Sequence, residues 1–181
     1  MSYAKRRMTE INTRGGRGAK SGIRLNIAVN YEMATDTQDD KVKWIDKGNG
    51  LYIAENRGVK TKQGLRVLAK EEAQARILAD LGHTVFLIPE KGSGKHYDAI
   101  VDGKKFEMKT VTGNENTFSH RFREALRQGD NVYLRVKSEV TPKRARELIK
   151  GVLKTKERTG LIYSYFDKTK TMYKWEMKDL K

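Results

Sequence analysis

The segment from Tyr97 to Thr110 contains residues whose types and spacing could do chemistry, namely Asp98, Glu107 and Lys109. A pair of carboxylates offers the hard oxygen ligands that a divalent cation such as Mg²⁺ prefers. A lysine beside that pair could orient a water molecule or help to remove its proton. This combination favours metal-assisted hydrolysis of a phosphodiester, provided that the chain brings the three side chains to one place.

The dipeptide Asp102-Gly103 predicts how these side chains meet. Asp-Gly between two runs of apolar residues is a strong hairpin signal, because a type I′ turn needs positive φ at both central residues. A two-residue loop places Asp98 directly opposite Glu107, and such opposed residues have Cβ atoms roughly 4.5 to 5.5 Å apart. Because two like charges this close destabilise a sheet, the pair needs a cation or a proton.

Side chains alternate between the two faces of such a hairpin. One face is apolar and predicts a core, and it carries Tyr97, Ala99, Val101, Phe106 and Met108. The opposite face is expected to be the polar site face, and it carries His96, Asp98, Ile100, Lys105, Glu107 and Lys109. A simpler alternative stays open, in which these acids and lysines form ordinary surface ion pairs that contribute little to stability.

The elements that must position the hairpin follow from hydrophobic periodicity and end signals. Helices are expected over residues 65–81 and 117–128, and a third begins at Thr141-Pro142, with a hydroxyl N-cap and a proline at the first position. Further strands are expected over residues 42–45, 51–53, 84–88, 131–136, 161–166 and 171–177. This order predicts an α/β fold with a mixed central sheet flanked by helices.

Composition narrows the possible partners. The chain has 181 residues, a net charge of +15 and no cysteine, so nucleic acid is the first expected partner, and a disulfide framework or thiolate zinc site is excluded. Residues 1–40 are rich in Gly, Arg and Lys and predict a flexible basic arm before a domain over residues 41–181. No apolar run predicts a membrane segment or a secretory signal, so cytoplasmic action is expected.

At this point the chain resembles a known superfamily. An acid-bearing helix, a strand, a hairpin with Asp98 and Glu107-Met108-Lys109, and then a helix and a strand are similar to the core of the PD-(D/E)xK nucleases. The segment from Glu71 to Val136 is most similar to the C-terminal nuclease domains of bacterial contact-dependent inhibition toxins and to phage-linked relatives. One departure is Tyr97, which stands where the motif's name has proline.

The resemblance implies a restriction-endonuclease-like core over residues 65–136 and a role for each site residue. Asp98, Glu107 and the main-chain carbonyl of Met108 would hold Mg²⁺ or Mn²⁺, and Lys109 would orient the attacking water. Glu71 would complete the site from the helix by holding a metal-bound water. Glu72 is the alternative, because a helix phase error of one residue exchanges the two.

The substrate and the partners are less closely defined. His120, Arg123 and Arg127 lie together on one face of the helix over residues 117–128, where they either line the substrate channel or form a solvated face. The toxin likeness implies tRNA or DNA as substrate, an acidic immunity protein as partner, and action in a bacterial or target-cell cytoplasm. The competing hypothesis is a non-catalytic basic protein, such as a phage or mobile-element structural component, that binds nucleic acid. The oligomeric state stays open.

Overall fold

The computed structural model describes residues 42–57, 61–89, 97–154 and 158–180, all within the compact unit Lys41–Lys181. The basic arm predicted for residues 1–40 lies outside the described residues, and so does His96. None of the helices in the described part of the chain is long and apolar enough to cross a membrane.

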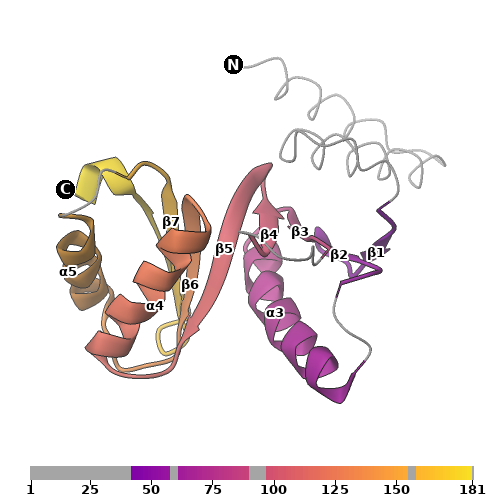
Figure 1. The fold of residues 1–181 in the computed structure, drawn as a ribbon, viewed down its shortest axis with the longest axis horizontal. Coiled ribbons are helices and arrows are strands. Elements are labelled where there is room, and N and C mark those ends of the chain that lie inside the picture. Colours follow the sequence, from indigo (N-terminus) through magenta and orange to yellow (C-terminus); the bar gives the residue numbers. More distant parts are fainter. Residues whose placement is uncertain (1–41, 58–60, 90–96, 155–157, 181) are drawn as a thin grey trace, which may run out of the picture. The chain divides into compact units, whose positions relative to one another are not determined.

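The described residues form one sheet of eight strands that lie side by side in chain order (Figure 1). The strands are β1 (Trp44–Asp46), β2 (Leu51–Ala54), β3 (Val85–Leu87), β4 (Ala99–Val101), β5 (Lys104–Val111), β6 (Asn131–Val136), β7 (Leu161–Phe166) and β8 (Thr171–Glu176). The pairs β2–β3, β5–β6 and β6–β7 are parallel, and the other neighbours are antiparallel. The predicted mixed α/β sheet is therefore confirmed.

Three helices begin at hydroxyl or amide caps, because these side chains accept a hydrogen bond from an otherwise unpaired backbone N–H. The helices are α3 (Lys62–Asp80, capped by Thr61), α4 (Glu115–Gln128, capped by Asn114) and α5 (Pro142–Leu153, capped by Thr141). The first two begin earlier than the apolar periodicity predicted, since their first turns are polar and only the caps mark them. A short 3-10 helix, Met177–Leu180, follows β8.

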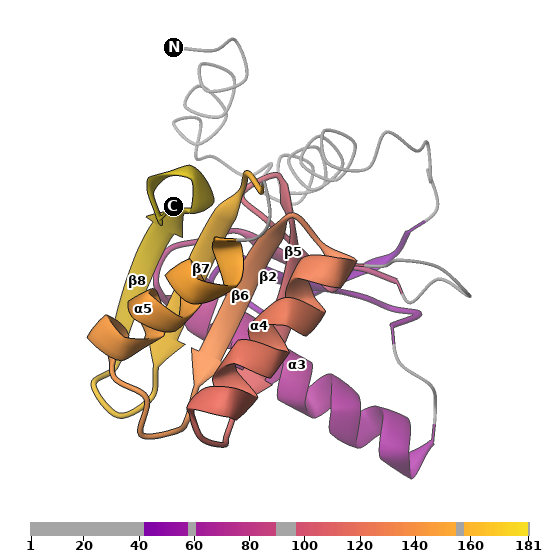
Figure 2. The ribbon, with the colours of Figure 1, turned by 60° about the vertical axis from the view of Figure 1, so that its left-hand side comes forward.

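The helices cover opposite faces of the sheet and form two separate apolar cores. Ala75 and Leu78 of α3 pack on the face that carries Val85, Phe106 and Met108. The second core lies on the other face, where α4 and α5 cover β6 and β7 (Figure 2). Its members include Phe118, Phe122, Ile149, Val132 and Leu134. Strand β5 supplies residues to both cores.

The alternation of side chains along the hairpin is as predicted, but the sequence did not reveal that the face with Ile100 and Glu107 is covered. Ile100 is fully buried opposite Phe86 of β3, and Glu107 is only 1% exposed. The reason is that strands in the middle of a mixed sheet are covered on both faces, which the polar residues of this strand concealed in the sequence.

Candidate active site

The hairpin that positions the site is closed by the expected two-residue turn. Asp102 and Gly103 have φ of 48° and 78°, as a type I′ turn requires. Val101 pairs with Lys104 and Ala99 with Phe106, so the register is the predicted one. The carboxylate of Asp102 also accepts hydrogen bonds from the backbone N–H of Thr84 at 2.9 Å and from His83 Nδ1 at 2.6 Å, which fixes the turn to the start of β3.

Asp98 lies immediately before β4 and is fastened to the backbone of β5. Its N–H donates to the carbonyl oxygen of Phe106 at 3.0 Å, and its Oδ2 accepts from the N–H of Met108 at 2.9 Å. Asp98 also raises the pKa of Glu107, so the two carboxyl groups lie close together. The carboxylate is therefore held in place by backbone groups beside the second acid.

Glu107 is a buried carboxyl with one oxygen unsatisfied. Its Oε1 pairs with Lys109 Nζ, two residues further along the same face of β5, whereas Oε2 is buried and has no hydrogen-bond partner. Burial and, after it, the neighbouring Asp98 raise the pKa of Glu107 to about 7 against the opposing effect of Lys109. A buried acid with a raised pKa beside another acid and a lysine is typical of a functional site.

Glu71 of α3 joins this group through an arginine that the sequence reasoning did not identify. Arg57 Nε donates to Glu71 Oε2 at 2.9 Å, and Arg57 Nη2 lies 3.6 Å from Asp98 Oδ1. Glu72, the alternative helix acid, instead forms an ion pair with Lys47 at 3.1 Å. The geometry therefore links Glu71, not Glu72, to the hairpin acids. Arg57 had no sequence signal, since it stands alone in a polar segment after β2.

The helix α4 borders the site along one edge. His120 is exposed and its Nδ1 lies 3.7 Å from Glu124 Oε2. Although burial raises the pKa of Glu124, the hydrogen bond from Arg121 and the nearby Lys109 help to hold that pKa below its usual value.

The other two expected substrate contacts, Arg123 and Arg127, are exposed on α4. They point away from the apolar face of Phe118 and Phe122, which packs on the sheet. His120, Arg123 and Arg127 thus share the exposed side of α4, and the contacts of the described residues join none of them directly to Asp98, Glu107 or Lys109.

The donor set suits a hard divalent cation. Asp98 and Glu107 supply carboxylate oxygens, one of which is buried without a partner, and the backbone of Met108 lies beside Asp98. Among the residues that the structure describes, no group of three or more His, Cys, Asp or Glu side chains is arranged to hold a metal ion. The carboxylate pair is thus the candidate, with main-chain oxygen as the further ligand.

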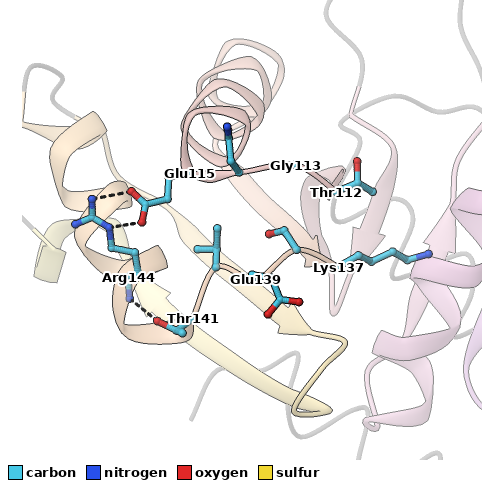
Figure 3. Close-up of a pocket in the computed structure, with 10 residues that line it drawn as sticks. Thr112, Gly113, Glu115, Lys137, Glu139, Thr141 and Arg144 are labelled. Atoms are coloured by element: carbon cyan, nitrogen blue, oxygen red, sulfur yellow. Dashed lines mark hydrogen bonds and ion pairs between the residues drawn. The ribbon is translucent and has the colours of Figure 1, made fainter.

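A separate hollow of about 670 Å³ lies where α4 and α5 begin, at the carboxyl ends of β5 and β6 (Figure 3). Its walls include Thr112, Lys137 and Arg144. The guanidinium of Arg144 already has protein partners. It donates two hydrogen bonds to the carboxylate of Glu115, at 2.8 and 2.7 Å, and one to Glu147 at 2.8 Å. The hairpin acids Asp98 and Glu107 do not line this hollow.

Comparison with known proteins gives two matches. Residues 95–180, just under half of the chain, match a family described as the contact-dependent growth inhibition CdiA C-terminal domain. A chain of the CdiA-CT/CdiI toxin and immunity complex from Burkholderia pseudomallei has a similar fold, with a TM-score of 0.51 and 19% sequence identity over 75% of this chain and 96% of that chain. No curated protein matches the chain.

The structural match concerns the fold, whereas the family match covers some of the candidate site residues. At 19% identity the structural match shows a shared fold. The segment that matches the family contains Asp98, Glu107 and Lys109, whereas Arg57 and Glu71 lie before it. Membership of the PD-(D/E)xK superfamily stays a prediction.

Proposed function

We propose that this chain is a divalent-metal-dependent nuclease that hydrolyses phosphodiester bonds of tRNA or DNA and acts as a toxin domain. The observation that carries the proposal is the buried Glu107, whose Oε2 has no hydrogen-bond partner and whose Oε1 pairs with Lys109, close to Asp98. Such an arrangement is costly for folding, because an unpaired buried carboxyl oxygen loses its hydration. A cation bound between the two acids would offset that cost.

Each residue has a distinct role in this proposal. Asp98 and Glu107, with the main-chain carbonyl of Met108, would hold Mg²⁺ or Mn²⁺. The ion would supply stabilisation of the charge that builds on the phosphate and would lower the pKa of the attacking water. Lys109, held by Glu107 Oε1, would orient that water and balance the developing negative charge. Water would add to phosphorus and lose a proton to bulk water, the P–O ester bond would break, and the leaving oxygen would take up a proton from bulk water.

Charge supports nucleic acid as the substrate. The chain carries +15, and basic surfaces attract the phosphate backbone and retain it without reading its sequence. His120, exposed on α4 with its Nδ1 3.7 Å from Glu124 Oε2, would contact a phosphate next to the scissile one. Arg123 and Arg127, also exposed on α4, would contact other phosphates of the strand.

The likeness to the CdiA C-terminal domain supports action as a toxin in the cytoplasm of a target cell. The matched structure is a complex of a toxin with an immunity protein. For this chain we accordingly propose an immunity protein as a partner. It would be acidic, because a negative surface complements a chain of +15 and speeds its association.

A cleavage assay tests the proposal directly. The full chain is mixed with labelled tRNA and with plasmid DNA in Mg²⁺, in Mn²⁺ and in EDTA. Cleavage is expected with metal only, and Asp98→Asn, Glu107→Gln and Lys109→Met should each lower the rate at least about a hundredfold. Glu139→Gln, which removes an exposed carboxylate paired with Lys168, is the control and should cleave normally.

The outcomes separate the candidate functions. If the chain binds nucleic acid but cleaves none under any metal condition, the non-catalytic alternative is correct. Cleavage that persists in EDTA and in the Asp98→Asn variant would exclude the metal site proposed here.

A further inference from the structure

The guanidinium of Arg57 is almost completely buried next to the proposed metal site. Its side chain is 3% exposed, and each of its nitrogens has a different partner. Nη1 donates to the carbonyl oxygen of Ile88 after β3, Nε donates to Glu71 Oε2 at 2.9 Å, and Nη2 faces Asp98 Oδ1 at 3.6 Å. One side chain thus joins the end of β3, the helix α3 and the first acid of the hairpin.

These contacts use the planar fork of arginine fully. A buried charge is tolerated only if it is paired and hydrogen-bonded, and a guanidinium can satisfy partners in several directions of one plane. Each carboxylate oxygen of Asp98 also has its own partner, since Oδ1 faces Arg57 and Oδ2 accepts a hydrogen bond from the N–H of Met108. Arg57 therefore restricts the orientation of the Asp98 carboxylate from the side of α3.

We propose that Arg57 is a positioning residue of the nuclease site, which fixes the orientation of the Asp98 carboxylate for catalysis and puts a permanent positive charge between Glu71 and Asp98. This inference rests on the proposed function. It also redefines Glu71, whose carboxylate acts through Arg57 by holding the guanidinium in place.

The proposal has a consequence that a purely structural arginine would not produce. A fixed positive charge near Asp98 repels a divalent ion, so its removal should strengthen metal binding. At the same time Asp98 loses its orientation, so cleavage should fall. Affinity for the metal and catalytic rate are thus expected to change in opposite directions.

The experiment measures Mn²⁺ binding to the full chain by electron paramagnetic resonance, alongside tRNA and plasmid cleavage at saturating Mn²⁺. In Arg57→Met, Mn²⁺ should bind about tenfold more tightly, the effect expected for one charge roughly 6 Å from a dication under water-like screening. Cleavage should fall at least about thirtyfold, a loss typical of a misplaced catalytic group. Circular dichroism and thermal unfolding report whether the variant folds.

A second variant decides the matter if Arg57→Met does not fold. Arg57→Lys keeps the charge but cannot reach Glu71, Asp98 and Ile88 together, so Mn²⁺ affinity should stay within about threefold while cleavage falls about tenfold. The matched control is Arg76→Met, since Arg76 of α3 is half-buried and donates to the carbonyl oxygens of Lys47 and Gly48. It should leave both readouts unchanged.

Each result has a defined meaning. Weaker or unchanged Mn²⁺ binding in folded Arg57→Met, or wild-type cleavage by Arg57→Lys, would overturn the positioning role while the nuclease proposal stands. If the wild-type chain itself neither binds Mn²⁺ in an Asp98-dependent manner nor cleaves nucleic acid, the proposed function fails and this inference fails with it.

Discussion

The carboxyl of Glu107 makes the folded state sensitive to pH in a direction opposite to that of most acids. Its pKa is raised from 4.5 to about 7, first by burial and then by Asp98. A raised pKa means that the folded chain binds this proton more tightly than the unfolded chain does. Protonation of Glu107 therefore stabilises the fold below about pH 4.5, and this contribution is lost as the pH rises through about 7.

The magnitude follows from the size of the shift. A difference of about 2.5 pKa units corresponds to about 3 kcal/mol, because each unit is worth about 1.4 kcal/mol. The side chain of Glu107 is only 2% exposed, so solvent screening reduces this figure little. Glu107→Gln mimics the protonated acid, since its carbonyl can accept from Lys109 and its amide can donate to Asp98. The variant should be more stable than wild type by about 3 kcal/mol at pH 8 and nearly equal to it at pH 4.5.

Urea unfolding in EDTA at several values between pH 4.5 and pH 8 measures this difference. Other titrating groups are common to both proteins, so the difference between the two curves isolates Glu107. Glu139→Gln, at an exposed ion pair, should follow the wild-type curve. The reasoning is refuted if the difference between wild type and Glu107→Gln stays constant over this range, or if wild type becomes the more stable of the two at pH 8.

Three further substitutions test other parts of the site. Glu71→Gln keeps an acceptor for Arg57 Nε and should lower cleavage about three- to tenfold, whereas a loss like that of Asp98→Asn would place Glu71 on the metal itself. Gly129→Ala adds a Cβ that would lie 3.3 Å from Glu107 Cβ, so thermal unfolding should show a loss of about 1 kcal/mol and cleavage should fall. Gly151→Ala, inside α5 with nothing within 4 Å of the new Cβ, should instead stabilise the fold by about 0.5 to 1 kcal/mol.

Local sequence signals were sufficient for the hairpin that carries the acids. Asp102-Gly103 determined the turn type, and the turn type determined the register from Val101–Lys104 to Ala99–Phe106. These steps depend on neighbours in the chain, which is why they could be derived without coordinates. The same holds for α5, whose start is marked by Thr141-Pro142.

Contacts between distant segments could not be derived in this way. Arg57 reaches Glu71, Ile88 and Asp98, and nothing in the local sequence around Arg57 distinguishes it from a solvated loop residue. To choose between Glu71 and Glu72, one must know which side of α3 faces the sheet. Because the 19 residues of α3 are of mixed polarity, their sequence defines that side only to within about one residue.

The burial of Glu107 shows what the alternation of side chains along a strand cannot predict. Alternation assigned Glu107 and Lys109 correctly to one face, but it could not show that the face is covered. Strand β5 is covered on both faces. Its Phe106 and Met108 lie in the core beneath α3, and its Val111 lies in the core beneath α4 and α5. A strand packed into two cores cannot shift without disturbing both. That rigidity holds Glu107 and Lys109 fixed relative to Asp98, which a precisely placed catalytic group requires.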